Sequence, residues 1–110
     1  MPDQISYEDF SKIEVRIGTV IAAEMVPETD KLIKCTVDFG EERSRTIVSG
    51  IAQWKKPEEL IGKQLPYIVN LAPRTLRGVV SEGMLFATDD GEGVVLLQLE
   101  RPVPPGTRMH

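Results

Sequence analysis

Two arginines, Arg74 and Arg77, carry the clearest chemical signal in this chain. They lie within Asn70–Met84, a segment that leaves one apolar run, turns at Pro73 and passes Gly78 before a second apolar run begins. Two cations on a short connection between strands form a small anion-binding projection that suits phosphate groups. The segment contains no side chain that resembles an activated nucleophile or a metal ligand. The predicted chemistry is therefore binding, without making or breaking bonds.

Catalysis and metal binding have little support elsewhere in the sequence. The single histidine, His110, is the last residue, and chain ends are rarely ordered enough to build a site. Asp89, Asp90 and Glu92 offer carboxylates for a hard cation. They lack the regular ligand spacing of a calcium loop and fit a charged hairpin turn better. We therefore predict a protein that is not an enzyme and that has no metal or cofactor.

The composition predicts one small domain spanning residues 1–110, with 41% hydrophobic residues. No apolar run approaches the roughly 20 residues that a membrane-spanning helix needs, and the first residues lack the features of a signal peptide. A single cysteine, Cys35, excludes an intrachain disulfide and fits a reducing compartment, where it is expected as a small buried hydrophobe. These features predict a cytoplasmic protein without membrane contact.

The net charge of -4 argues against a strongly basic nucleic-acid binder, but the charge is unevenly distributed. Residues 1–30 hold two basic and seven acidic side chains, whereas residues 31–77 hold nine basic and five acidic ones. The middle of the chain is therefore locally basic, and a basic surface attracts the phosphates of nucleic acids.

Hydrophobic periodicity and turn signals predict short strands with two short helices. The helices are expected at residues 6–13, where Ser6 can cap the first turn, and at 57–62, which begins with proline and ends with glycine. A phase shift near Gly18 predicts a bulge or sharp bend in the first strand. The proline-rich segment 102–106 cannot extend a sheet. The strands are expected at residues 14–26, 32–39, 45–50, 64–71, 79–88 and 94–99.

Five or six strands with a short helix between the third and the fourth indicate an all-β fold, the OB-fold, a five-stranded Greek-key barrel. A β-sandwich would need about seven strands and no helix at that position. OB barrels commonly bind oligonucleotides on strands two and three and between the loops joining strands one to two and four to five. By this count the two loops are residues 27–31 and 73–78, so Lys31 and the two arginines fall on them. Lys34 lies on the polar face of the second strand.

Aromatic side chains, the usual means of gripping single strands, are few. Phe10, Phe39 and Phe86 occupy apolar positions and are expected in the core. Trp54, beside two lysines in a polar connection, can either stack on a base or cover the end of the barrel. The shortage of free aromatics favours a folded, helical RNA that is recognised through its shape and its phosphates.

Residues at the end of the arginine-bearing segment have two interpretations each. Met84 follows a glycine in an apolar run and fits the core, but near the loop it can also pack against an unstacked base. Glu82, among basic residues, can orient Arg74 or Arg77 through a salt bridge or accept a hydrogen bond from a base.

Several segments resemble the tRNA-binding OB domain found at the C-terminus of bacterial methionyl-tRNA synthetases, as a separate beta subunit and as a free-standing dimeric protein. The resemblance covers about residues 9–99, and Asn70–Met84 is its most specific part. The other matching segments are residues 9–18, 29–32, 48–51 and 60–63.

This resemblance implies an OB barrel that binds the elbow of tRNA by shape, without anticodon specificity. It also implies a homodimer built by the N-terminal segment and the C-terminal tail, residues 100–110, and a methionyl-tRNA synthetase as a partner to which the chain delivers tRNA. The tRNA contacts that it implies are Lys31, Asn70, Arg74, Arg77, Ser81, Glu82 and Met84. Lys34 and Trp54 join this set because of their places on the expected barrel.

A related group, the CsaA-type export-associated chaperones, is similar in barrel, length and dimerisation. Residues 98–107 look like that group, whereas residues 29–31 and 81–84 look more like the tRNA binders. The sequence thus predicts a tRNA-binding protein, with a peptide-binding chaperone as the alternative.

Overall fold

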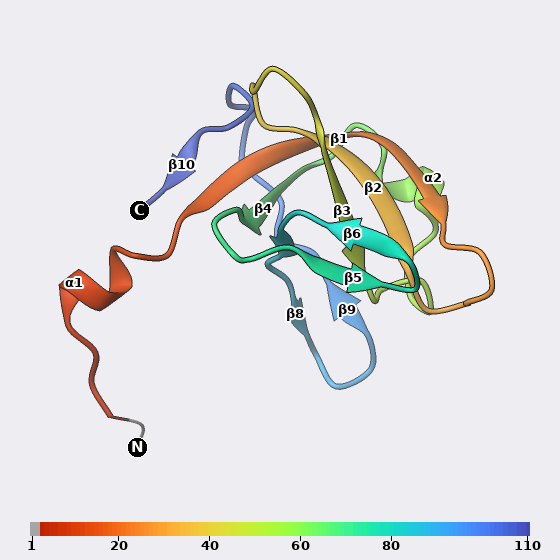
Figure 1. Cartoon of the computed structure of the whole chain (residues 1–110), viewed down its shortest axis with the longest axis horizontal. Coiled ribbons are helices and arrows are strands. Elements are labelled where there is room, and N and C mark those ends of the chain that lie inside the picture. The colour runs from red at the N-terminus through yellow and green to blue at the C-terminus, as the bar shows by residue number, and fades with distance from the viewer. Residues whose placement is uncertain (1–2) are drawn as a thin grey trace.

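A curled antiparallel sheet forms the centre of the molecule, as Figure 1 shows. The computed structural model describes residues 3–110; Met1 and Pro2, which the predicted domain includes, lie outside the described residues. The main strands follow the order β3-β2-β1-β4-β7. Their bounds are Val15–Met25 for β1, Ile33–Asp38 for β2, Arg45–Ser49 for β3, Gln64–Ile68 for β4 and Met84–Leu85 for β7.

The sheet closes nearly completely because residues 81 and 82, just before β7, form hydrogen bonds with β3. The amide of Glu82 donates to the carbonyl of Thr46 at 2.8 Å, and the amide of Val48 donates to the Ser81 hydroxyl at 2.9 Å. These bonds join the two ends of the strand order, so the sheet becomes a barrel. The predicted all-β, five-stranded OB-type barrel with short helices is confirmed.

The first strand is long enough to serve both sides of the barrel. Its first half, Val15–Thr19, pairs with β4, and its second half pairs with β2. The register shift lies between Val20 and Ala22, so the predicted bulge occurs later than Gly18.

Gly18 meets a packing need instead. A Cβ atom there would overlap Cγ1 of Val37 and would lie 2.7 Å from Cε1 of Phe39. The glycine therefore lets two core side chains of the barrel approach the backbone of β1.

The core is filled by side chains that alternate along the strands. In β2, Ile33, Cys35 and Val37 are buried, as the alternation predicts. Burial raises the pKa of the Cys35 thiol to about 11, so the thiol stays protonated at neutral pH. Phe39 and Tyr67 meet edge to face with ring centroids 5.5 Å apart. The rest of the cluster is Val20, Ile47, Ile51, Leu60, Leu65 and Val69.

Both predicted helices are present and short. In α1, Tyr7–Phe10, the Ser6 hydroxyl accepts a hydrogen bond from the amide of Asp9 at 3.0 Å, which is the expected cap. In α2, Pro57–Leu60, the last residue is buried in the core, so this helix covers one end of the barrel.

Two phenylalanines expected in the core are exposed. Phe10 on α1 is 49% exposed and Phe86, just after β7, is 46% exposed, whereas Phe39 is buried. The prediction for Phe10 and Phe86 was wrong because α1 stands away from the barrel (Figure 1) and residue 86 points to the same outer side as the N-terminal segment.

The expected strand 79–88 is divided into three pieces. They are β6 (Val79–Ser81), β7 and β8 (Thr88–Asp89), and the last pairs with β9 (Val94–Val95) in a small hairpin. The first break follows Ser81, whose hydroxyl bonds across to β3 and to the carbonyl of Gly83. Beyond β9 the side chains still alternate, with Leu96 inward and Leu97 outward, but the backbone leaves the sheet.

The C-terminal segment re-enters the sheet after the prolines. β10, Arg108–Met109, pairs with Arg16 and Val15 of β1, on the edge opposite β4. The bonds continue back to Gly106, whose amide donates to the carbonyl of Ile17 at 2.7 Å. Residues 102–106 themselves form no strand, as predicted, but they lead into one.

Candidate nucleic-acid interface

The predicted loop 73–78 is a β-hairpin. β5, Arg74–Leu76, pairs with β6, and Arg74 lies opposite Ser81. The two-residue turn is Arg77–Gly78, with φ angles of 52° and 80°. Two successive positive φ angles are the requirement of a type I′ turn, which matches the twist of the strands. Arg74 is thus exposed at the base of the hairpin and Arg77 is exposed at its tip.

A groove of about 440 Å³ runs beside this hairpin. Arg74 and Met84, two of the predicted contact residues, both line it. Leu32 and Ile51 give it apolar walls, and Asp89 adds a carboxylate at the β8–β9 hairpin. The groove therefore offers apolar surface, one cation and one acceptor together, a combination that suits an unstacked nucleobase and its phosphate.

The first predicted loop lies at the same groove. Lys31 is exposed at the end of the β1–β2 connection, and its carbonyl accepts a hydrogen bond from the amide of Ala52 at 3.1 Å. Its neighbour Leu32 lines the groove. The structure thus places the loops carrying Lys31 and Arg74 next to one groove, as the OB geometry predicts.

Lys34 has its charge compensated on the sheet. It lies directly opposite Glu24 across the β1–β2 pair, and its Nζ is 2.8 Å from the Glu24 carboxylate. The lysine faces outward as predicted, but a phosphate would have to compete with Glu24 for its ammonium group.

Trp54 packs on the β8–β9 hairpin. A Cβ at Gly93 would lie 2.7 Å from Cδ1 of the indole, so the ring rests on the glycine backbone. The outer part of the ring remains exposed. Trp54 therefore supports the β8–β9 hairpin and keeps the outer part of its ring exposed.

The amide side chain of Asn70 joins β4 to the N-terminal segment. Its Oδ1 accepts a hydrogen bond from the backbone amide of Glu14 at 2.9 Å, and its Nδ2 donates to the carbonyl of Lys12. Asn70 is exposed, but both ends of its amide are engaged within the chain.

Ser81 and Glu82 hold the hairpin to the barrel. Ser81 is buried, and its hydroxyl donates to Gly83 and accepts from Val48. Glu82 forms a two-point ion pair with Arg43, so the predicted salt bridge with Arg74 or Arg77 was wrong. This ion pair is the main cause that lowers the pKa of Glu82.

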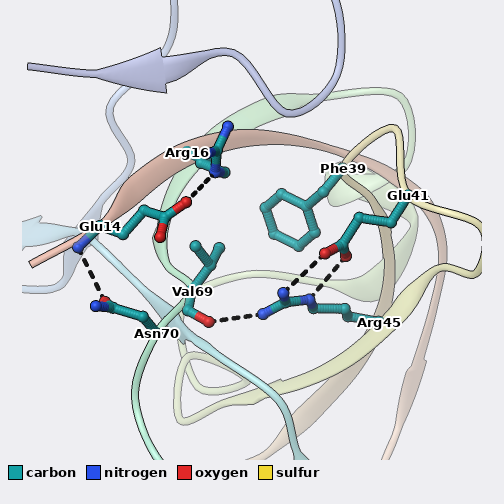
Figure 2. A pocket seen from close by; sticks show the side chains of 7 residues that line it. All are labelled: Glu14, Arg16, Phe39, Glu41, Arg45, Val69 and Asn70. Atoms are coloured by element: carbon teal, nitrogen blue, oxygen red, sulfur yellow. Dashed lines mark hydrogen bonds and ion pairs between the residues drawn. The ribbon is translucent and has the colours of Figure 1, made fainter.

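A second cavity, of about 430 Å³, opens at the mouth of the barrel, shown in Figure 2. Arg45 donates to both carboxylate oxygens of Glu41 at 2.9 Å and lies over the ring of Phe39 at 5.6 Å. Arg16 pairs with Glu14 on one side of the cavity and donates to the carbonyl of Gly106 at 2.7 Å. The charges at this mouth are therefore paired with one another.

The sequence contains a signal for this pairing. The basic middle of the chain includes Arg43 and Arg45, yet Glu41 and Glu42 stand directly before them. This closeness indicates the ion pair of Arg45 with Glu41, whereas Arg43 pairs with the distant Glu82. Among residues 3–110, the ion pairs include Lys34, Arg43 and Arg45 but not Lys31, Arg74 or Arg77.

Neither a metal centre nor a membrane segment is found in the described part of the chain. Within residues 3–110, no three His, Cys, Asp or Glu side chains are grouped so as to hold a metal ion. None of the helices there has the length and apolar character needed to cross a membrane.

The fold and the groove define an OB-type binding barrel, and comparison with known proteins identifies its family. A family model described as "Putative tRNA binding domain" matches residues 15–108. The chain is 47% identical over 109 residues to a methionine–tRNA ligase of Methanococcoides burtonii and 48% identical over 106 residues to one of Bacteroides fragilis. These matches cover 98% and 96% of this chain but only 16% of each ligase.

Two solved structures have the same architecture. A MetRS-related protein from Pyrococcus horikoshii has a TM-score of 0.92 at 41% identity, over 99% of this chain and 100% of that chain. The chaperone CsaA from Bacillus anthracis has a TM-score of 0.87 at 34% identity, over 98% of this chain and 100% of that chain. The chain belongs to the tRNA-binding domain family. The family is one of binding domains, in agreement with the predicted absence of catalysis.

Proposed function

We propose that this domain binds tRNA without catalysing a reaction, and that it does so at the groove beside the β5–β6 hairpin. The observation that carries the proposal is a group of three cations that lie outside the ion pairs of residues 3–110 and whose loops share one groove. Lys31, Arg74 and Arg77 come from the two loops that OB barrels use for nucleic acids, and one groove lies beside both loops.

The groove also favours recognition of folded RNA. Its apolar walls and the exposed Met84 can receive one unstacked base, while the cations contact phosphates on either side. Among the described residues that line it, none is aromatic, so an extended single strand would find few stacking platforms there. The elbow of tRNA, where loops meet and bases are displayed, fits this description.

The test is tRNA affinity measured against salt concentration. Replacing both arginines, Arg74→Ala with Arg77→Ala, should weaken binding to all tRNAs about equally. It should also reduce the salt slope by about one for each phosphate that no longer meets a cation. Arg101→Ala is the matched control, because Arg101 is exposed and lies outside the groove.

Two results would oppose the proposal. One is wild-type protein that fails to bind tRNA at low salt; the other is a double variant with the wild-type salt slope. The alternative is a peptide-binding chaperone, and one structural neighbour is named a chaperone. Such a protein would instead suppress aggregation of an unfolded client, and the arginine changes would leave that suppression intact.

We further propose that the domain acts as a homodimer in the cytoplasm. α1 and β10 together line an apolar groove of about 530 Å³ whose walls include Tyr7, Phe10, Phe86 and Met109. Such a surface is unfavourable in water, and a second copy of the chain would cover it.

Because methionine–tRNA ligases contain a similar domain, we propose that the chain delivers tRNA to a methionyl-tRNA synthetase.

A further inference from the structure

We propose that Arg45 is a positioning residue for tRNA binding, because its guanidinium holds both ends of the segment that carries Arg74 and Arg77. The inference builds on the proposed function and adds a residue that lies outside the groove.

The contacts of one nitrogen define this role. Arg45 Nη1 donates to the carbonyl of Val69 at 2.7 Å and to the carbonyl of Glu82 at 3.1 Å. Val69 is the last barrel residue before the segment 70–81, and Glu82 is the first residue after it. Figure 2 shows the guanidinium between Val69 and Glu41, at the mouth of the barrel. A single side chain on β3 therefore ties together the two points where the segment leaves and rejoins the barrel.

The guanidinium is itself held in a fixed orientation. Glu41 binds Nε and Nη2 at 2.9 Å each, and the ring of Phe39 lies 5.6 Å from the guanidinium carbon. The Arg45 side chain is 23% exposed, which makes it the least exposed cation of the ion pairs in residues 3–110. A planar fork gripped at two atoms leaves its remaining nitrogen aimed at the two carbonyls.

Besides the Arg45 bonds, the segment 70–81 is held by polar contacts of Asn70 and Ser81 at its two ends, and it buries little apolar surface between them. Its last residue, Ser81, is buried. None of the other side chains is buried, and only Leu76 and Val79 are half-buried. A hairpin without a core of its own depends on the bonds at its two ends, since few apolar contacts resist rotation. Loss of the Arg45 bonds would therefore let Arg74 and Arg77 move relative to the groove while the barrel stays folded.

Lysine at this position separates charge from geometry. Arg45→Lys keeps the positive charge but replaces the planar fork with a point charge that cannot reach Glu41 at two points and both carbonyls together. Glu41→Gln is a milder second variant, because it keeps Arg45 and removes only the charge that orients it.

The experiment measures hydrogen–deuterium exchange and tRNA affinity of the full chain. In Arg45→Lys, amides of residues 70–81 should exchange faster by about tenfold or more, the change expected from losing a charge-assisted hydrogen bond. Amides of β2 should keep their wild-type rates. In affinity, the double change Arg74→Ala with Arg77→Ala should cost far less in the Arg45→Lys background than in wild type, because the arginines are already misplaced.

Three results would overturn the positioning role. They are unchanged exchange of residues 70–81 in both variants, loss of protection in β2 together with the hairpin, and full additivity of the affinity losses. If the wild-type chain does not bind tRNA, the proposed function fails alone, because the exchange rates still decide whether Arg45 holds the hairpin.

Discussion

The guanidinium of Arg43 meets the carboxylate of Glu82 at two points, with Nη1 3.1 Å from Oε1 and Nη2 2.6 Å from Oε2. The pair joins the β2–β3 connection to the turn that follows β6. Arg43 is 74% exposed, and an ion pair so open to water stabilises the fold only weakly by itself. Its effect is on placement, because Glu82 also accepts a hydrogen bond from the amide of Thr46 and so fastens the end of the hairpin to β3.

Acid should weaken this fastening. Arginine neighbours lower the pKa of Glu82 and of Glu41 in the folded chain. Such groups stabilise the fold fully above the unfolded pKa of about 4.3, and the stabilisation is lost as pH falls through the lower folded values. Urea unfolding should therefore change little between pH 7 and about pH 5 and should show a falling free energy below about pH 4.

Glu82→Gln isolates the contribution of Glu82 to this pH dependence of the free energy of unfolding. The variant should be less stable than wild type at neutral pH and should lose less stability in acid. Glu100→Gln, an exposed acid outside the ion-pair network, is its control. A Glu82→Gln variant with the pH dependence of wild type would contradict the prediction.

Gly18→Ala should destabilise the barrel by about 1–3 kcal/mol, because the added methyl group would overlap Val37 and Phe39 in the core. Urea denaturation gives the free energy of unfolding. Gly50→Ala is the matched control, since a Cβ there meets only Leu32, at 3.9 Å. Equal free energies of unfolding for the two variants would contradict the prediction and show that Val37 and Phe39 can move to accept the methyl group.

Ser81→Ala should cost about 1–3 kcal/mol, because it leaves the buried amide of Val48 without the acceptor that it has now. Thermal or urea unfolding measures this loss. Ser44→Ala is the control, since that hydroxyl makes no hydrogen bond within residues 3–110. A stable Ser81→Ala protein with weakened tRNA binding would instead make the hydroxyl a direct RNA contact.

Phe86→Glu should convert the proposed dimer into a folded monomer, because a carboxylate on the apolar groove opposes burial against a second copy. Sedimentation velocity reports the state. Ile61→Glu changes an equally exposed hydrophobic residue outside the groove and should leave the dimer intact. A wild-type chain that sediments as a monomer at all concentrations tested would contradict the proposed homodimer.

Local patterns predicted the parts of the fold that local forces determine. The alternation from Ile33 to Phe39 gives β2 because one face must be buried, and Ser6 begins α1 because its hydroxyl satisfies a free amide. Proline and glycine at either end of residues 57–62 likewise bound a single short helix.

The features that sequence reasoning missed depend on partners far apart in the chain. Glu82 lies 39 positions from Arg43, so nearby arginines were the obvious partners in sequence and the wrong ones in space. β10 forms because the backbone of residues 108–109 pairs with residues 15–16 of β1, a partner far away in the sequence that no local pattern near the prolines could show. The need for glycine at position 18 likewise comes from β2, a different strand.

At the tip of the β5–β6 hairpin, the residue that best fits the backbone conformation is not the residue that carries the positive charge. Arg77 holds a φ of 52°, a conformation that asparagine and glycine adopt more readily than arginine does. Asparagine followed by glycine is the favoured pair in such a turn, so selection for heat resistance alone would enrich Arg77→Asn. Selection for RNA affinity would retain the arginine. A single position therefore makes directed evolution for durability and for affinity diverge.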